Sequence, residues 1–219
     1  MTADQALIPA IGLGAGGHAR VVIDILELGG RYRPFGLLDA DPDLWGREVF
    51  GVPVLGGDGL LERMKEQGVS RFFVGLGGVG DLQPRIDLYR AGLAAGLAPL
   101  EAVHPRAVVS GRADLGPGLT VMAGAVINPG ADIGENAVVN TGAVVEHDCT
   151  LGDHAHIATG ALLSGGVRVG RAAHVGAGAV VRQGISIGPE ALIGAGAVVV
   201  KDIPEGAVVA GNPAGPLQR

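Results

Sequence analysis

A histidine flanked by two acids, Glu146-His147-Asp148, is the part of the sequence best suited to proton transfer. An imidazole has an unperturbed pKa of about 6.5, so its neutral form can take a proton from an attacking nucleophile at neutral pH. A carboxylate beside the ring would raise its basicity and fix its tautomer. We therefore predict that His147 is a general base supported by Asp148. The alternative is an imidazole on a solvated corner.

A glycine-rich turn near the N-terminus is suited to binding phosphate. Gly14, Gly16, Gly17 and His18 follow a short apolar run and precede a helical pattern. Glycines at a strand-to-helix turn let the backbone approach a phosphate, whose charge the helix N-terminus favours. Asp39 ends the next expected strand, where a ribose-binding acid of a dinucleotide enzyme would lie.

The length of this first segment favours one interpretation of the glycine-rich turn. Only about 100 residues precede the repeat described below, roughly half of a doubly wound dinucleotide fold. One mononucleotide half suits a nucleoside diphosphate attached to another group. A dehydrogenase and a purely structural glycine turn are the alternatives.

A six-residue repeat dominates the rest of the chain. Starting at residue 103, every sixth residue is Val, Ile or Leu without interruption, and Ala usually follows four residues later. Period six fits neither an amphipathic helix nor a long strand, but it suits short strands that turn corners around a shared axis. The aliphatic positions are Val103, Val109, Leu115, Val121, Ile127, Ile133, Val139, Val145, Leu151, Ile157, Leu163, Val169, Val175, Val181, Ile187, Ile193 and Val199.

The repeat resembles the hexapeptide repeats of left-handed parallel β-helices, in which three hexads form one triangular coil. Residues eighteen apart then lie on neighbouring coils, which puts Gly165 next to His147. A backbone N–H there could stabilise an oxyanion. The same spacing predicts that His156 and His174 lie next to each other on neighbouring coils. Zinc-binding β-helix enzymes use paired histidines five residues apart, a spacing that this chain lacks, so we expect no metal and interpret His154 and His174 as surface or packing residues.

Residues 1–100 alternate between strand and helix patterns. We expect strands at 8–13, 35–38 and 71–76 and helices at 19–28, 60–67 and 82–95. Such alternation predicts a parallel sheet. The predicted fold is therefore an α/β half-Rossmann-like domain (1–100) followed by an all-β left-handed β-helix (101–219).

Composition excludes several classes of function. The net charge is −6 with no basic run, so nucleic acid is not an expected partner. We find neither a signal peptide nor an apolar run long enough to span a membrane, and the single cysteine, Cys149, suits a reducing compartment. We therefore expect a cytoplasmic protein. Cys149 takes a position that is usually Ala, so packing explains it better than a nucleophilic role.

Two segments together, Gly14–Val22 (GAGGHARVV) and Asn140–Cys149 (NTGAVVEHDC), resemble the NeuD/PglD-type family of sugar acetyltransferases over essentially the whole chain. The resemblance implies an acetyl-CoA-dependent enzyme in which His147 is the catalytic base and Asp148 supports it. It implies no bound cofactor, acetyl-CoA as cosubstrate, a nucleotide-linked amino sugar as acceptor, and a homotrimer with active sites between adjacent β-helices.

The resemblance also assigns binding residues. Gly14, Gly16, Gly17 and His18 would contact the nucleotide-sugar diphosphate, with Asp39 near the base. The family often has a second acid after Asp39, and Ala40 stands there, which puts the base specificity in question. Independently of the resemblance, Asn140 follows an inward aliphatic and could orient the substrate, with an asparagine that stacks within the coil as the alternative. The residues implied for acetyl-CoA are His156, Gly165, Gly176, Ala177, Gly194 and Ala195.

The resulting prediction is N-acetylation of the 4-amino group of a nucleotide-linked 4-amino-4,6-dideoxy sugar by direct attack. UDP is the favoured nucleotide, with GDP and dTDP as alternatives. O-acetylation of sialic acid or another surface glycan is the rival reaction. A non-catalytic nucleotide-sugar-binding protein is the rival from a different class.

Overall fold

The computed structural model describes residues 6–217, and the chain divides into two compact units. Residues up to Gly77 and Gln83–Ala102 form the first unit. Gly78–Leu82 and the residues from Val103 onward form the second, so a short segment of the N-terminal half belongs with the C-terminal repeats. No described helix is long and apolar enough to cross a membrane.

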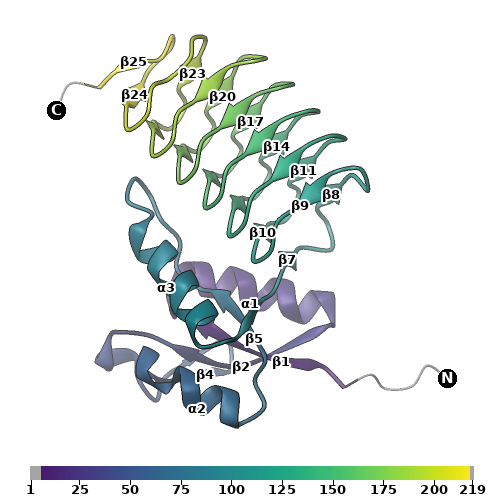
Figure 1. Ribbon diagram of the computed structural model, residues 1–219, viewed down its shortest axis with the longest axis vertical. Coiled ribbons are helices and arrows are strands. Elements are labelled where there is room, and N and C mark those ends of the chain that lie inside the picture. Colours follow the sequence, from purple (N-terminus) through teal and green to yellow (C-terminus); the bar gives the residue numbers. More distant parts are fainter. Residues whose placement is uncertain (1–5, 218–219) are drawn as a thin grey trace. The chain divides into compact units, whose positions relative to one another are not determined.

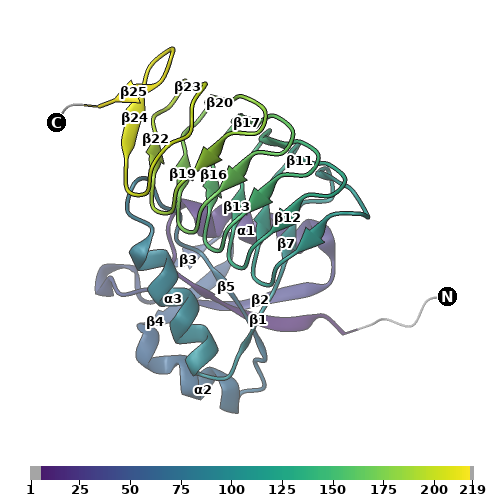
Figure 2. The ribbon, with the colours of Figure 1, turned by 45° about the horizontal axis from the view of Figure 1, so that its top comes forward.

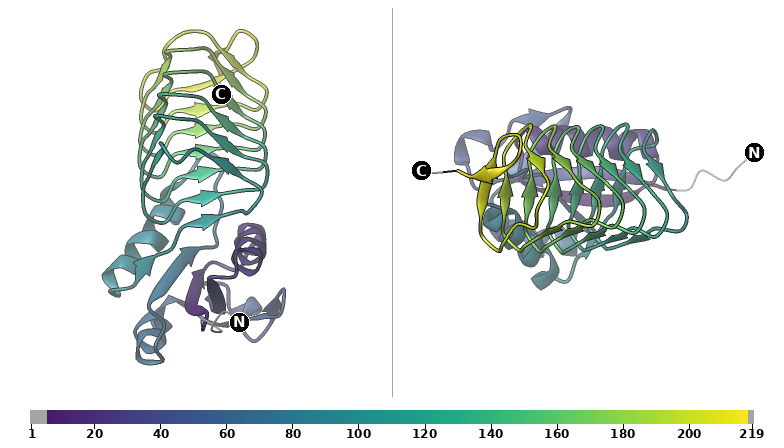
Figure 3. Two further views of the ribbon diagram at one scale, coloured as in Figure 1. Left: turned by 90° about the vertical axis from the view of Figure 1, so that its right-hand side faces the viewer. Right: turned by 90° about the horizontal axis from the view of Figure 1, so that it is seen from above.

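The first unit is a six-stranded sheet in the order β3-β4-β2-β1-β5-β6, parallel except for the β3–β4 pair. From β1, the strands β2 and β4 are added on one side and β5 and β6 on the other, and the helices lie on both faces of the sheet (Figure 3). The elements are β1 (Ile8–Leu13), α1 (Gly17–Gly29), β2 (Tyr32–Leu38), β3 (Glu48–Val49), β4 (Val52–Gly56), α2 (Leu61–Glu66), β5 (Arg71–Val74), α3 (Gln83–Ala94) and β6 (Ala98–Pro99), with 3-10 turns at Pro42–Leu44 and Asp58–Leu60.

The sequence predicted β1, β2, β5 and the three helices but missed β3, β4 and β6. The five residues of β4, Val52–Gly56, contain Pro53 and end in Gly56, which weakens the pattern of a strand. Proline is tolerated at Pro53 because β4 lies near the sheet edge and pairs there with only the two-residue β3. Helix α1 begins two residues earlier than expected, at Gly17, with Gly16 as its N-cap and no side-chain cap.

The second unit is a three-sided parallel β-helix whose coils stack along one axis (Figure 1). We name its sides after their first strands. The β7 sheet contains β7 (Ala102–Val103), β10 (Thr120–Val121), β13 (Val138–Val139), β16 (His156–Ile157), β19 (His174–Val175), β22 (Leu192–Ile193) and β24 (Val208–Ala210), closed by antiparallel β25 (Gly215–Pro216). Figure 2 shows these strands side by side.

The other two sides follow at each turn of the chain. The β8 sheet contains β8 (Val108–Val109), β11 (Val126–Ile127), β14 (Val144–Val145), β17 (Leu162–Leu163), β20 (Val180–Val181) and β23 (Val198–Val199). The β9 sheet contains β9 (Asp114–Leu115), β12 (Asp132–Ile133), β15 (Thr150–Leu151), β18 (Arg168–Val169) and β21 (Ser186–Ile187).

The hexad aliphatics and most of the alanines form the interior of the β-helix. From Leu119 onward they are buried in one continuous cluster, and Cys149 occupies an alanine position within it. Strand residues eighteen apart pair in register along each sheet, for example Val126 with Val144 and Val144 with Leu162. The period of six therefore fixes one inward and one outward residue for each two-residue strand.

Candidate active site

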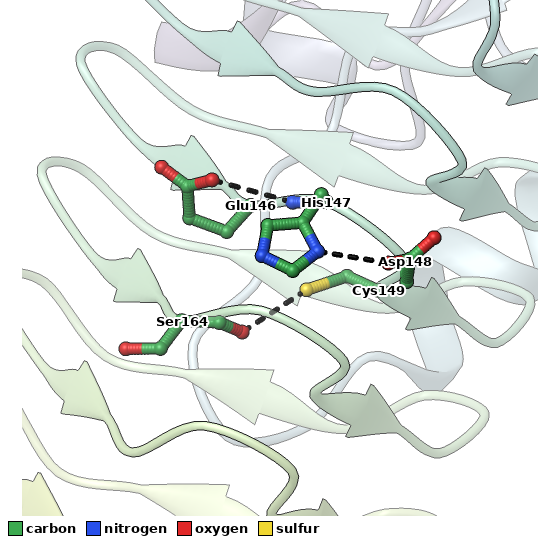
Figure 4. Close-up of polar contacts among 5 residues, drawn as sticks. All are labelled: Glu146, His147, Asp148, Cys149 and Ser164. Atoms are coloured by element: carbon green, nitrogen blue, oxygen red, sulfur yellow. Dashed lines mark hydrogen bonds and ion pairs between the residues drawn. The ribbon is translucent and has the colours of Figure 1, made fainter.

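His147 lies in the turn between β14 and β15, and Asp148 follows it in a left-handed backbone conformation with φ 59°. The Nδ1 atom of His147 lies 2.8 Å from Asp148 Oδ2 (Figure 4). An ionised carboxylate only accepts hydrogen bonds, so the proton is on Nδ1 and Nε2 keeps its lone pair. The hydrogen bond to Asp148 is the main reason that the pKa of His147 lies above its usual value; desolvation opposes the shift, and the charges of Asp148 and Glu146 add to it.

Gly165 lies against the ring of His147, as the eighteen-residue spacing predicts. A Cβ atom at position 165 would come within 2.6 Å of both Cε1 and Nε2 of His147. Only glycine therefore leaves room for the ring in this position. Gly166 N donates to the carbonyl of His147 at 2.9 Å, which joins the two turns. Among the described residues, the N–H of Gly165 takes part in no hydrogen bond.

Cys149 is next to this pair in sequence but faces the interior. Its side chain is fully buried, and Sγ donates a hydrogen bond to the carbonyl of Ser164 (Figure 4). Burial raises the pKa of its thiol, which disfavours the reactive thiolate. The packing interpretation of Cys149 fits this environment.

A groove of about 400 Å³ runs along the turns that follow the β7-sheet strands. Its lining includes five of the six residues predicted to bind acetyl-CoA: His156, Gly176, Ala177, Gly194 and Ala195. The sixth, Gly165, lies beside His147, in a turn that follows the β8 sheet. Within one chain, the β8 sheet thus separates His147 from the groove.

A chain of hydrogen bonds fixes Asn140 and His156 in the groove. Asn140 Oδ1 accepts from the N–H of Thr141 at 2.7 Å and from the hydroxyl of Thr159 at 3.3 Å, so the amide nitrogen faces His156 Nε2 at 3.3 Å. On the other side, His156 Nδ1 lies 3.0 Å from the carbonyl oxygen of Gly78. Because a carbonyl only accepts, Nδ1 donates and Nε2 accepts from Asn140.

The glycine turn of the first unit leaves the N-terminus of α1 accessible. Cβ atoms on Gly16 or Gly17 would meet nothing within 4 Å, whereas one on Gly14, at φ 97°, would approach the backbone of Gly75 and Leu76. The first turn of α1 has neither an acidic residue nor a side-chain cap. Its N–H groups can therefore meet an anion.

Asp39 supports this turn directly. Its Oδ2 accepts from the N–H of Ala15 at 2.7 Å and its Oδ1 from the N–H of Asp41 at 2.9 Å. Its carbonyl accepts from the indole of Trp45 at 2.8 Å. Trp45, the only tryptophan, is 47% exposed beside Asp39. Trp45 is not among the residues predicted for the site; its signal in the sequence is a lone tryptophan six positions after Asp39.

Arg85 of α3 is a second residue that the sequence analysis missed. It is buried, and its Nη1 donates to the carbonyl of Leu76 at 2.7 Å and lies 3.4 Å from His18 Nε2. Burial lowers the pKa of Arg85 to about 10, so it stays charged at neutral pH. A buried cation next to His18 favours an anion at the glycine turn.

The remaining histidines differ from the expectation in part. His154 and His174 are 5% and 3% exposed, so neither is a surface residue. His154 packs beside Asn136, with 3.1 Å between Nδ1 and the amide nitrogen. Within residues 6–217, no group of three or more His, Cys, Asp or Glu side chains could hold a metal ion.

Three family models match the chain. Residues 11–91 match the PglD N-terminal domain, residues 130–165 the bacterial transferase hexapeptide (six repeats), and residues 166–201 the hexapeptide repeat of succinyl-transferase. No curated protein sequence is significantly similar to the chain.

Solved structures resemble the chain over nearly its whole length. PerB from Caulobacter crescentus, in complex with CoA and GDP-perosamine, is 43% identical with a TM-score of 0.90, covering 97% of this chain and 99% of its own. The acetyltransferase domain of PglB from Neisseria gonorrhoeae, in complex with acetyl coenzyme A, is 37% identical with a TM-score of 0.88, covering 97% and 100%. WeeI from Acinetobacter baumannii, at 24% identity and a TM-score of 0.76, shares the fold. The predicted fold class, an α/β domain followed by a left-handed β-helix, is confirmed.

Proposed function

The chain belongs to the NeuD/PglD-type family of sugar acetyltransferases, and on this premise we propose that it transfers the acetyl group of acetyl-CoA to the amino group of a nucleotide-linked 4-amino-4,6-dideoxy sugar. The observation that carries the proposal is the His147–Asp148 pair: an exposed imidazole with its Nε2 lone pair available and a carboxylate on Nδ1. This arrangement suits a base that deprotonates an amine during attack.

The reaction is a direct attack. The amine nitrogen adds to the thioester carbonyl carbon of acetyl-CoA while His147 Nε2 takes a proton from that nitrogen. The C–S bond then breaks, the thiolate of CoA leaves, and the imidazolium of His147 returns the proton to sulfur. The N–H of Gly165, adjacent to the ring, is our candidate donor to the oxyanion of the tetrahedral intermediate. Asp148 stabilises the imidazolium.

Acetyl-CoA occupies the groove along the β7 sheet. Support comes from the lining by His156, Gly176, Ala177, Gly194 and Ala195, where small residues leave room for an extended ligand. PglB of Neisseria gonorrhoeae, similar over nearly the whole chain, holds acetyl coenzyme A. Asn140, fixed by its hydrogen bonds to Thr141 and Thr159, orients the reacting groups at one end.

The diphosphate of the sugar nucleotide binds at the N-terminus of α1, at Gly16, Gly17 and His18. The exposed N–H groups there and the buried charge of Arg85 support this placement. The family resemblance favours UDP as the nucleotide, whereas the PerB structure contains GDP-perosamine. Trp45 beside Asp39 provides a fluorescence reporter for titrations with GDP, UDP and dTDP.

The active enzyme is a homotrimer with each active site between two β-helices. The separation of His147 from the groove by the β8 sheet supports this assembly. An active site that contains both must take His147 from one subunit and the groove from its neighbour. The outward residues of the β8 sheet give further support. They form an entirely aliphatic row, which includes Val108 at 65%, Leu162 at 38% and Val180 at 40% exposure.

The test is a free-thiol assay with acetyl-CoA and a panel of GDP-, UDP- and dTDP-linked 4-amino-6-deoxy sugars. We expect thiol release with one nucleotide class and a loss of roughly 100-fold or more in kcat for His147→Ala. Near wild-type turnover of that variant at saturating substrate would overturn the base assignment. Turnover of sialic acid without turnover of any amino sugar would overturn the acceptor, and no thiol release with any acceptor would favour a binding protein.

A further inference from the structure

His174 points outward from β19 and is nevertheless only 3% exposed. Its neighbours in register are His156 on β16 and Leu192 on β22. The ring of His156 stands edge-to-face with that of His174, with 4.8 Å between centroids. The segment 78–82 covers this row of outward side chains. The carbonyl oxygen of Gly78 accepts a hydrogen bond from His156, and a Cβ on Gly80 would contact Leu192. His174 is thus enclosed, but it still lines the groove.

The two ring nitrogens of His174 have different environments. Nδ1 is buried and has no hydrogen-bond partner among the described residues. An unpaired buried N–H is rarer and more costly than an unpaired lone pair, so the proton belongs on Nε2. Burial also lowers the pKa of His174, which keeps the ring neutral at pH 7. The imidazole therefore has one N–H donor, and Nε2 is the nitrogen left for the groove.

The position of His174 in the row indicates which part of a ligand it meets. Neighbouring coils are one strand spacing apart, about 4.8 Å. If the thioester of acetyl-CoA lies beside Asn140 and His156, the next coil lies level with the first amide of the pantetheine arm, two methylene groups from sulfur. An amide carbonyl that enters a mainly apolar groove needs a donor there, because an unpaired one would lose its hydrogen bonds to water.

We propose that His174 binds acetyl-CoA through a hydrogen bond from Nε2–H to the carbonyl oxygen of this first, cysteamine amide. The inference rests on the proposed function, because it takes the groove to be the acetyl-CoA site. It gives a specific binding contact to a residue that the sequence analysis interpreted as surface or packing. His156 is less suited to this contact, because its nitrogens face Gly78 and Asn140.

The experiment compares two ligands that differ by the pantetheine arm. Calorimetry measures the Kd of CoA and of adenosine 3′,5′-bisphosphate, which lacks the arm, for the wild type, His174→Leu and His174→Gln. We expect His174→Leu to weaken CoA roughly three- to tenfold, the range for one neutral hydrogen bond, and to leave the bisphosphate unchanged. His174→Gln keeps an N–H donor and should retain part of the affinity for CoA.

The outcomes separate this inference from the proposed function. An unchanged Kd of CoA in His174→Leu overturns the inference, and so does an equal loss for both ligands, which would indicate a general disturbance of the groove. A wild type that binds no CoA at all contradicts the proposed function instead. Thermal melting of each variant checks the fold. If His174→Leu unfolds at a lower temperature than the wild type, the Kd of CoA is compared between His174→Gln and the wild type.

Discussion

At the scale of single residues, His147 owes its position to a carboxylate on one side and a missing side chain on the other. Asp148 holds Nδ1 at 2.8 Å, and the bare Cα of Gly165 leaves space for the ring. The Asp148 carboxylate in turn lies over Gly130, where a Cβ would approach its Oδ1 to 2.6 Å. Turn glycines from neighbouring coils thus shape the space around both members of the pair.

The first prediction concerns pH. Asp148 raises the pKa of His147 above that of a free imidazole. In the proposed mechanism the active base is the neutral imidazole, so kcat/KM of the wild type falls as the pH drops through this raised pKa. In Asp148→Asn the pKa of His147 falls, so the acid limb moves to lower pH. Because the base is then weaker, kcat/KM on the high-pH plateau also falls, on the order of tenfold. A pH–rate profile measures both effects.

Glu146→Gln is the matched control for that profile. The charge of Glu146 also raises the pKa of His147, but it contributes least to the shift. The acid limb of the Glu146→Gln profile should therefore move less than that of Asp148→Asn. An unshifted profile in Asp148→Asn would remove Asp148 from its supporting role.

The second prediction concerns Gly165. In Gly165→Ala the added methyl group would occupy the place of the His147 ring, which must rotate away from its position. We expect kcat to fall roughly 100-fold, as on loss of the base, while the KM for the nucleotide sugar stays near the wild-type value. Gly111→Ala is the control, because a Cβ there meets nothing within 4 Å. Full activity of Gly165→Ala would show that the ring need not occupy this place.

At the scale of elements, the sides of the β-helix differ in what they present outward. The β8 sheet presents only aliphatic residues: Val108, Val126, Val144, Leu162, Val180 and Val198. The β9 sheet presents Asp114, Asp132, Thr150, Arg168 and Ser186 at the equivalent positions. Strands of equal length and register thus form one side suited to association and another suited to water.

The third prediction tests the apolar side. Leu162 lies in mid-row between Val144 and Val180, so Leu162→Glu would place a charge where an assembled interface excludes water. We expect a folded monomer by light scattering, with the thioester-dependent activity lost. Thr150→Glu on the β9 sheet is the control that should keep the wild-type mass. A Leu162→Glu variant that keeps the wild-type mass would rule out this interface.

At the scale of the whole molecule, one chain holds His147 at one corner of the β-helix and the groove at another. The β8 sheet lies between these two corners. In the proposed trimer a second subunit joins the two, and cyclic assembly lets every chain contribute its His147 to one neighbour and its groove to the other.

The fourth prediction follows from that sharing. His147→Ala lacks the base, and Ala177→Trp fills the groove with a large ring, so each variant alone should be inactive. Mixed trimers formed by co-expression contain interfaces with an intact base facing an intact groove, about a quarter of all interfaces for random assembly. Recovery of activity in the thiol assay at that level supports the shared site. No recovery in trimers that contain both variants would place base and groove in the same subunit.

The β-helix and its interior could be predicted from the amino-acid sequence alone. Seventeen aliphatics at exact period six leave one architecture in which each faces a common axis, and the same period put Gly165 next to His147 without any coordinates. The strand–helix alternation similarly predicted three of the six strands of the first sheet, β1, β2 and β5, and its three α-helices. Local patterns suffice here because strand and coil periods are properties of the chain itself.

The environments of the outward residues arise only in the folded chain. From the sequence, His174 is one more histidine. In the structure it is 3% exposed among His156, Leu192 and segment 78–82, and its Nδ1 has no hydrogen-bond partner among the described residues. In the same way, only the folded chain shows that the carboxylate of Asp39 accepts hydrogen bonds from the N–H groups of Ala15 and Asp41. Burial and partners arise from segments distant in sequence, and no local pattern encodes those contacts.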